Sequence, residues 1–308
     1  MIPRHILRVD QFQRQDLDRL FTHAEEMRRV VESGGDQRLS GRVLATLFFE
    51  PSTRTRLSFE SAMLRLGGQV ISSESAGITS SAAKGETIED TVRIVESYAD
   101  VIAIRHHQAG TSEAAAAVSG VPILNAGDGA REHPTQALLD LFTIREELGR
   151  IDGLTVVLAG DLRFGRAARS LAMLLSETRD TRIILVAPRG IEMSGDVLDT
   201  LSERGVRFEE NPDLPSAMRE ADVVYMTRVQ KERFPSDEEY AAVSGSYRFG
   251  REHLEFLRSE AIVMHPLPRV DEIDAEVDDD RRAAYFRQAR NGVFIRMALL
   301  DLLLRQHS

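Results

Sequence analysis

Residues 48–60, Phe-Phe-Glu-Pro-Ser-Thr-Arg-Thr-Arg-Leu-Ser-Phe-Glu, concentrate groups that can bind an anion. Three hydroxyls (Ser52, Thr53, Thr55) and two arginines (Arg54, Arg56) fall within five positions. The apolar run before them predicts a buried strand, and apolar residues at helical spacing after them predict a helix. At such a turn the first backbone N–H groups and the positive end of the helix dipole point to one spot. The stretch therefore predicts a site for a doubly charged oxyanion such as phosphate.

An ordinary helix start is the alternative interpretation of this stretch. Ser52 or Thr53 would then be a helix N-cap, and the two arginines would be solvated. A cap needs one hydroxyl, whereas this turn carries three hydroxyls and two arginines. The surplus favours the anion site.

Composition excludes several classes of function. The 308 residues can form two domains, and 42% hydrophobic with 29% charged residues is typical of a soluble globular protein. The absence of cysteine excludes disulfides, thiolate metal sites and a thiol nucleophile. A net charge of −10 argues against a general nucleic-acid binder. We see no signal peptide, membrane-spanning run or metal site, so we expect a cytoplasmic protein without a membrane or nucleic-acid partner.

The first half of the chain alternates between expected strands and helices, which predicts a parallel sheet with crossover helices. Expected strands at 43–49, 69–72, 101–105 and 121–124 alternate with helices, the last over 134–148, and residues 125–129 read as a turn. Arg105 ends one strand, and His133 immediately precedes the last helix. Because ligands bind at the carboxyl ends of such strands, we expect these groups to lie near residues 52–56.

A second α/β round begins near Ile151, with expected strands at 154–159, 183–187, 207–209, 223–226 and 262–264. The spacing of Gly160 and Gly165 is not that of a dinucleotide-binding fingerprint, which disfavours a dehydrogenase. Residues 278–282 read as a solvated charge run. The closing helix, 293–305, is apolar on several faces and should pack back on the first domain. We therefore expect one domain at 1–148 with the helix at 291–308, and another at 149–290.

Residues 72–85 are rich in hydroxyls and include Ser80 and Lys84. This composition suits a mobile functional loop and a plain solvated connection equally well.

Four segments, 49–56, 84–86, 133–136 and 265–269, resemble the motifs of the aspartate/ornithine carbamoyltransferase family, and the resemblance covers nearly the whole chain. Segments 226–233 and 269–273 resemble the members that use aspartate. Ornithine-using members typically carry a cysteine at position 266 and an Asp-x-x-x-Ser-Met-Gly motif, and this chain has neither. The resemblance implies a transferase that converts carbamoyl phosphate and L-aspartate to N-carbamoyl-L-aspartate and phosphate, the committed step of pyrimidine synthesis, without a cofactor.

The resemblance also implies roles for particular residues. The phosphate would be held by Ser52, Thr53, Arg54 and Thr55, and Arg105 would bridge the phosphate and the carbamoyl oxygen. Thr55, Arg105 and His133 would polarise the carbamoyl carbonyl, and its amide would be oriented by Gln136 and the backbone carbonyls of Pro266 and Leu267. The aspartate carboxylates would be held by Arg166, Arg228 and Gln230, and Leu267 would also belong to the aspartate site.

In the family the loop carrying Ser80 and Lys84 reaches a neighbouring subunit, where Lys84 takes part in catalysis and aspartate binding. The implied assembly is a cyclic homotrimer with shared sites, acting alone or with regulatory chains or another enzyme of the pathway.

Some residues have competing interpretations. His133 could serve only as a helix-start residue. We expect Arg56 to tie its loop to an acidic residue such as Glu86, and His265 to be structural. Two alternatives for the whole chain are a sister transcarbamoylase with another acceptor such as ornithine, and a non-catalytic homologue.

Overall fold

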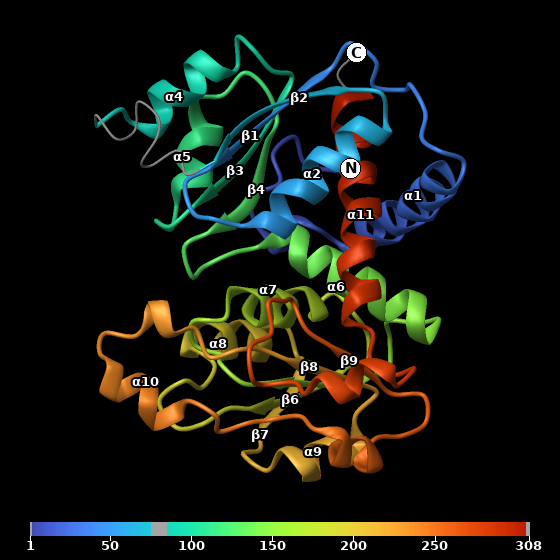
Figure 1. The fold of residues 1–308 in the computed structure, drawn as a ribbon, viewed down its shortest axis with the longest axis vertical. Helices are drawn as coiled ribbons and strands as arrows, with labels where there is room; N and C mark the ends of the chain where they lie inside the picture. The colour runs from blue at the N-terminus through green and yellow to red at the C-terminus, as the bar shows by residue number, and fades with distance from the viewer. Residues whose placement is uncertain (1, 75–84, 306–308) are drawn as a thin grey trace. The chain divides into compact units, whose positions relative to one another are not determined.

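The computed structural model describes residues 2–74 and 85–305. The chain divides into two compact units, Met1–Leu139 with Arg290–Ser308, and Asp140–Ala289 (Figure 1). Each unit contains a parallel sheet flanked by helices, which confirms the fold class expected from the sequence. Ser80 and Lys84 lie outside the described residues.

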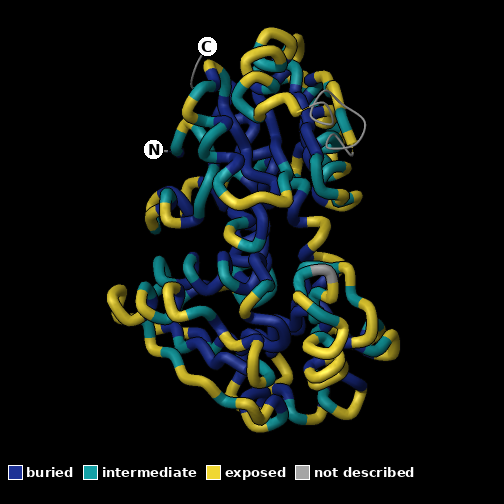
Figure 2. The backbone as a smooth tube through the Cα atoms, turned by 90° about the vertical axis from the view of Figure 1, so that its left-hand side faces the viewer, coloured by how far each residue is buried: buried dark blue, intermediate teal, exposed yellow. Residues whose placement is uncertain are grey.

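The sheet of the first unit has the order β2-β1-β3-β4, with all neighbours parallel. Its strands are β1 (Val43–Phe48), β2 (Gln69–Glu74), β3 (Val101–His106) and β4 (Ile123–Asp128). Figure 2 shows the buried backbone, in dark blue, running through the interior of each unit. The inner strands β1 and β3 are largely buried, whereas the edge strand β2 is mostly exposed. This gradient explains why β1 reads as a continuous apolar run, since a central parallel strand is covered on both faces.

Helices of the first unit follow from apolar residues at helical spacing. They are α1 (Arg14–Glu32), α2 (Thr53–Arg65), α4 (Ile88–Val95) and α5 (Thr111–Val118), with the start of α6 (Pro134–Leu148) and most of α11 (Tyr285–Arg305). In α1, the residues Leu17, Leu20, Phe21 and Ala24 are fully buried at the i, i+3, i+4 spacing of one helix face.

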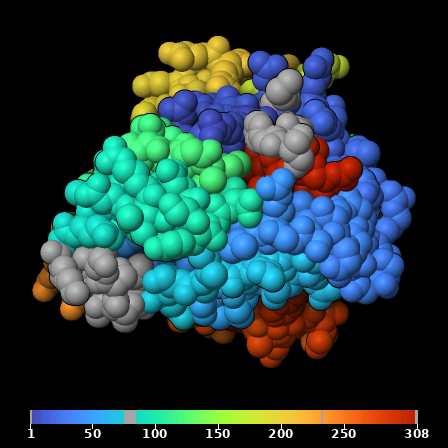
Figure 3. Space-filling model, turned by 90° about the horizontal axis from the view of Figure 1, so that it is seen from above, coloured from blue at the N-terminus to red at the C-terminus, as the bar shows by residue number. Residues whose placement is uncertain are grey.

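The closing helix α11 packs within the first unit, as the sequence predicted. Asp301 accepts from His23 Nε2 at 2.7 Å and pairs with Arg38 Nη1 at 3.1 Å, and the Arg296 guanidinium lies 4.8 Å from the Phe59 ring centre. Figure 3 shows the red end of this helix flanked by blue N-terminal segments. The helix starts at Tyr285 rather than at the expected Val293. Polar residues and Gly292 dilute the apolar pattern of that first part, so periodicity did not reveal it.

The sheet of the second unit has the order β7-β6-β5-β8-β9, again with all neighbours parallel. Its strands are β5 (Thr155–Ala159), β6 (Arg182–Val186), β7 (Arg207–Glu210), β8 (Val223–Met226) and β9 (Ile262–Met264). Its helices are α7 (Arg166–Leu175), α8 (Gly195–Glu203), α9 (Leu214–Glu220) and α10 (Asp237–Val243), with short 3-10 turns at Lys231–Arg233, Arg251–Phe256 and Ala275–Asp279.

Strand β4 corrects one sequence prediction. It runs from Ile123 to Asp128, whereas a strand at 121–124 and a turn at 125–129 were expected. Asn125 pairs with Ile104 and Asp128 pairs with His106, with a shift of register between them. Gly127 takes a φ of 126°, so this turn-forming residue sits inside an irregular strand.

None of the helices within residues 2–74 and 85–305 combines the length and apolarity needed to cross a bilayer.

Candidate active site

The turn that carries Ser52 and Thr53 lies between the buried strand β1 and the start of α2, where the sequence predicted it. Ser52 occupies the N-cap position in an extended conformation, but its side chain makes no capping hydrogen bond. The first turn of α2 contains no acidic residue that would compete for the helix dipole. Thr53 and Arg54 are exposed, and Thr55 is buried. The Ser52 hydroxyl therefore does not act as a helix N-cap, contrary to the alternative interpretation of this stretch.

Arg105 lies next to this turn, at the end of the neighbouring strand β3. Its backbone oxygen accepts from Phe49 N at 2.8 Å, and its side chain is only 11% exposed. The guanidinium pairs with Glu50 Oε1 at 3.1 Å and reaches the Ala126 carbonyl at 3.4 Å. Sequence reasoning did not single out Glu50, although it lies within the same motif, because its partner is distant in the chain.

His133 and Gln136 are placed by a tight return after β4. Asp128 N donates to Glu132 O at 3.0 Å, so the chain folds back before α6 begins. The His133 carbonyl accepts from Gln136 N at 3.0 Å in the first turn, and both side chains are buried. Residues 52–55, Arg105 and His133 thus all leave the carboxyl ends of β1, β3 and β4, which are adjacent strands, as the sequence predicted.

Arg56 has a different partner from the expected one. Its Nη2 lies 2.9 Å from Glu74 Oε2, and its Nη1 lies 3.7 Å from Glu60 Oε1. Glu86 instead accepts from Thr91 Oγ1 at 2.8 Å. The prediction of an acidic partner is correct and the choice of Glu86 is wrong, because α2 and the end of β2 supply nearer carboxylates.

In the second unit, Gly160 brings the ends of β5 and β8 together. It has a φ of 113°, and a Cβ at this position would lie 2.2 Å from Thr227 O. A side chain would therefore clash with the backbone of the next strand end, and this φ is also unfavourable for other residues. Close approach of two strand ends, rather than a dinucleotide, explains this glycine.

Asp161 connects the two loops that carry the predicted aspartate-binding residues. Its carboxylate accepts from Phe164 N at 2.8 Å and from Gln230 N at 3.3 Å. Gln230 Nε2 also donates to Phe164 O at 3.0 Å. Burial raises the pKa of Asp161, an effect that the backbone donors and the Arg228 charge partly oppose. Asp161 was missed, although its position directly after a strand and a glycine was an available signal.

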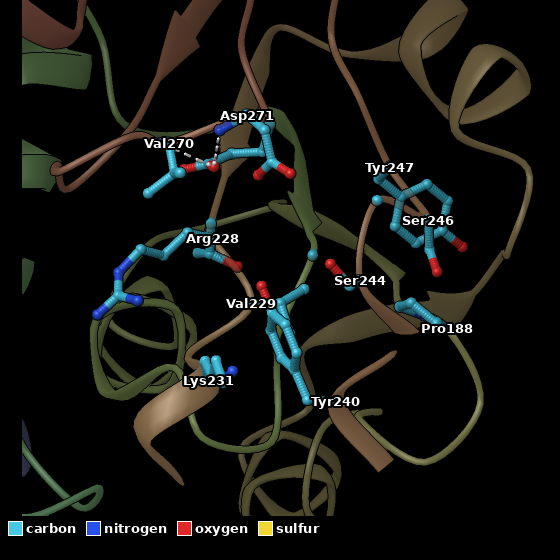
Figure 4. Close-up of a pocket in the computed structure, with 14 residues that line it drawn as sticks. Pro188, Arg228, Val229, Lys231, Tyr240, Ser244, Ser246, Tyr247, Val270 and Asp271 are labelled. Carbon is cyan, nitrogen blue, oxygen red and sulfur yellow. Dashed lines mark hydrogen bonds between the residues drawn. The ribbon is translucent and has the colours of Figure 1, made fainter. Parts of the chain in front are cut away.

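A cavity of about 180 Å³ opens beside these loops in the second unit (Figure 4). It is lined by Gly160, Pro188, Thr227, Arg228, Val229, Lys231, Tyr240, residues 244–247 and residues 270–272. In Figure 4 the guanidinium of Arg228 extends away from the tyrosines. Arg166 is the first residue of α7 and directly follows the loop 161–165, which Asp161 connects to Gln230. Arg166 is 8% exposed.

Segment 265–269 leaves β9, the strand beside β8. Leu267 has a φ of 54°, and the Leu267–Pro268 peptide bond is cis. A positive φ costs a non-glycine residue about 1–2 kcal/mol. A non-glycine residue keeps a positive φ where the contacts around it fix the backbone. His265 is buried at 1% exposure, in accordance with its expected structural role.

The expected solvated charge run at 278–282 is partly wrong. Asp278 pairs with Arg269 and also accepts from Tyr285, and Asp280 makes a paired contact with Arg282 at 2.8 Å for both oxygens. The Asp280 and Arg282 side chains are only 22% and 17% exposed. Asp278 and Asp280 thus have arginine partners in the fold, whereas Asp279 is exposed, and a linear run of charges does not reveal this difference.

Each unit therefore presents its own set of basic and polar side chains at the carboxyl ends of its strands. In the parts of the chain that the structure covers, no three histidine, aspartate or glutamate side chains form a cluster suited to a metal ion.

Comparisons with known proteins match the two halves of the chain to two domains of one family. A family domain described as "Aspartate/ornithine carbamoyltransferase, carbamoyl-P binding domain" matches residues 4–146, and "Aspartate/ornithine carbamoyltransferase, Asp/Orn binding domain" matches residues 152–303. The chain is 52% identical to the chloroplastic aspartate carbamoyltransferase of Arabidopsis thaliana, over 97% of this chain and 77% of that protein. It is also 52% identical to the aspartate carbamoyltransferase catalytic subunit of Methanopyrus kandleri, over 98% and 97%.

A solved structure shares the fold. Aspartate transcarbamoylase from Trypanosoma cruzi, in complex with carbamoyl phosphate and aspartate, has a TM-score of 0.90 and 44% identity, covering 96% of this chain and 95% of that one.

Proposed function

This chain belongs to the aspartate/ornithine carbamoyltransferase family, and from this premise we propose that it transfers the carbamoyl group of carbamoyl phosphate to the amine of L-aspartate (EC 2.1.3.2). The products are N-carbamoyl-L-aspartate and phosphate. The observation that carries the proposal is 52% identity over nearly the whole chain to a catalytic subunit with this activity in its name. The Trypanosoma cruzi relative, whose structure contains both substrates, supports it.

In the proposed mechanism the first unit is the carbamoyl phosphate domain. Ser52, Thr53, Arg54 and Thr55 bind the phosphate through hydroxyl, guanidinium and backbone N–H donors at the start of α2. The uncapped Ser52 hydroxyl and the absence of acidic residues in the first turn of this helix support the assignment.

The carbamoyl carbonyl is polarised by Thr55, Arg105 and His133. As the amine attacks, negative charge develops on this oxygen, and donors already aimed at it stabilise the tetrahedral intermediate. Burial of Thr55 and His133 supports the role, because it limits the reorganisation of these groups during the reaction. Gln136 and the backbone carbonyls of Pro266 and Leu267 orient the amide end.

The second unit is the proposed aspartate domain. Arg166, Arg228 and Gln230 bind the two carboxylates and so direct the α-amine to the carbamoyl carbon. The departing phosphate accepts the amine proton, so the mechanism requires no side-chain base. We expect the units to close during turnover, with Lys84 adding a contact to aspartate.

Lys84 and Ser80 act in a neighbouring subunit, so the functional form is a homotrimer with shared sites. Mixing inactive Lys84→Ala chains with inactive Arg54→Ala chains should restore part of the activity, because some sites then receive both intact groups. Mixed trimers that stay inactive, after their composition has been verified by mass spectrometry, would contradict shared sites.

We also expect a larger complex with regulatory chains or another pyrimidine-pathway enzyme, which is supported by one relative named a catalytic subunit and another named a multifunctional protein. Cytoplasmic location stays a prediction from the sequence, and the relative from Arabidopsis thaliana is chloroplastic.

The proposed activity is tested by phosphate release from carbamoyl phosphate with L-aspartate or L-ornithine as acceptor. We expect turnover with aspartate and not with ornithine. Turnover with ornithine alone would indicate the sister activity, and lack of turnover with both in a verified trimer would indicate another acceptor or a non-catalytic role.

A further inference from the structure

Glu272 and His265 form a buried pair beneath the segment that follows β9. His265 Nε2 lies 2.6 Å from Glu272 Oε1, and the two residues are 1% and 5% exposed. Seven positions separate them in the sequence, so the pair closes the segment 265–272 into a loop. Neither residue is among those that the proposed mechanism places on a substrate.

The hydrogen bonds fix the protonation of the imidazole. His265 Nδ1 accepts from Leu267 N at 2.8 Å, so Nδ1 carries no proton. Nε2 must then carry the proton and donate it to Glu272. The ring thus links the Glu272 carboxylate to the backbone N–H of Leu267, the residue with a φ of 54°.

Glu272 has to be an acceptor at both oxygens. While Oε1 faces His265, Oε2 accepts from Val270 N at 3.0 Å and from Asp271 N at 3.1 Å, the bonds drawn in Figure 4. Burial raises the pKa of Glu272, but the donors from His265 and the backbone outweigh it and leave the pKa below its usual value. An amide in place of the carboxylate would direct an N–H at one of these donors.

The backbone of His265 is held by a second set of hydrogen bonds. Its backbone N donates to Gln288 Oε1 at 2.9 Å, and Gln288 Nε2 donates to Asp140 Oδ1 at 2.6 Å. Tyr225 OH donates to Asp140 Oδ2 at 2.7 Å, and these side chains are at most 1% exposed. The start of the loop is therefore tied into the buried interior of the second unit.

We propose that Glu272 and His265 are positioning residues, which hold the backbone carbonyls of Pro266 and Leu267 in place to accept hydrogen bonds from the carbamoyl amide. The proposal rests on the function proposed above and adds two residues to it. They act through the backbone and touch neither substrate.

Acetyl phosphate provides a probe for this role. It shares the phosphate and the carbonyl of carbamoyl phosphate but has a methyl group in place of the amide. Calorimetric dissociation constants for the two compounds therefore separate amide recognition from phosphate recognition. In Glu272→Gln we expect the preference for carbamoyl phosphate to fall by roughly tenfold, the equivalent of one or two hydrogen bonds. We also expect kcat to fall by roughly 100-fold, because the reacting group is misplaced.

Two substitutions at His265 should reduce the preference for carbamoyl phosphate to different extents. His265→Asn keeps an acceptor for Leu267 N and loses the bond to Glu272, so its loss of preference should be smaller than that of His265→Ala. His253→Asn is the matched control, since His253 Nδ1 also accepts a backbone hydrogen bond, from Gly250 N at 3.0 Å. Its preference for carbamoyl phosphate should match that of the unmodified chain.

The outcomes separate the two proposals. Variants that bind both phosphates less tightly by the same factor, or that keep the full preference for carbamoyl phosphate, would overturn the positioning role. Failure of the unmodified chain to turn over would instead contradict the proposed function. If His265→Ala does not fold, Glu272→Gln and His265→Asn still decide the question.

Discussion

The proposed substrate-binding residues are organised differently in the two units. In the first unit, four of the proposed phosphate-binding residues lie in one run, Ser52 to Thr55, at the start of a helix. In the second unit, Arg166, Arg228 and the loop 265–267 leave three different strands, and Asp161 joins two of these loops. A contiguous motif can be recognised in a sequence, whereas a dispersed site depends on the fold that assembles it.

Burial differs between the two helix starts that carry proposed binding residues. Thr53 and Arg54, at the start of α2, are exposed, whereas Arg166, at the start of α7, is buried. The contrast is confined to these helix starts, because Thr55 and His133 of the first unit are buried and Arg228 of the second unit is half-buried.

The largest expected effect tests the phosphate cradle. Arg54→Ala should lower kcat/KM for carbamoyl phosphate by roughly 100- to 1,000-fold, because it removes a charged donor from the reacting group. Initial rates of phosphate release measure this. Arg19→Ala, an exposed arginine of α1 in the same unit, is the control and should leave the rate unchanged. Equal losses in both variants would argue against a special role for Arg54.

A second prediction concerns the aspartate site. Arg166→Ala should raise the KM for aspartate by roughly 10- to 100-fold, the effect of one charged hydrogen-bonding group. The dissociation constant for carbamoyl phosphate alone should stay within about twofold, if the two sets of residues act on separate substrates. Arg163→Ala lies three positions earlier, is exposed, and should change neither constant. A matching loss of carbamoyl phosphate binding in Arg166→Ala would show that the sites are not separable.

The smallest expected effect is on stability, and it concerns the ion pair between Asp280 and Arg282 in the second unit. The hydrogen bonds from Arg282 lower the pKa of Asp280 to about 2. A carboxyl group with a depressed pKa stabilises the fold above its unfolded pKa, and this contribution is lost as the pH falls from about 4 to about 2. Asp280→Asn should cost about 1–2 kcal/mol of unfolding free energy at pH 7 and less at pH 3.

Denaturant titrations at both pH values check this last prediction. The exposed neighbour Asp279, changed to Asn, serves as the control. A cost for Asp280→Asn that does not change with pH would mean that the lost shape, and not the lost charge, destabilises the unit.

The sequence predicted the alternation of elements well, because buried strands and amphipathic helices carry strong apolar patterns. It predicted α6 at Pro134–Leu148 and β8 at Val223–Met226 to the residue. It failed where polar or glycine-containing segments adopt regular structure, as in the end of β4 and the first part of α11. The positions of Ser52 to Thr55, Arg105 and His133 at strand ends were also predictable.

Partners distant in the chain could not be predicted. Arg56 pairs with Glu74 rather than Glu86, and Glu50 pairs with Arg105, because register and sheet order decide which side chains meet. The contacts of Asp161 with Gln230 and of Glu272 with His265 also depend on how the fold brings loops together. The spacing of residues along the chain does not predict which side chains meet in this way.

The placement of α11 has a consequence for synthesis of the protein. Domains generally fold in the order in which they leave the ribosome. Here the first unit needs residues 290–305, which follow the whole second unit in the chain, to cover Phe59 and to pair Asp301 with His23. The second unit has no such requirement. The unit proposed to bind phosphate can therefore finish folding only after the unit proposed to bind aspartate has been synthesised in full.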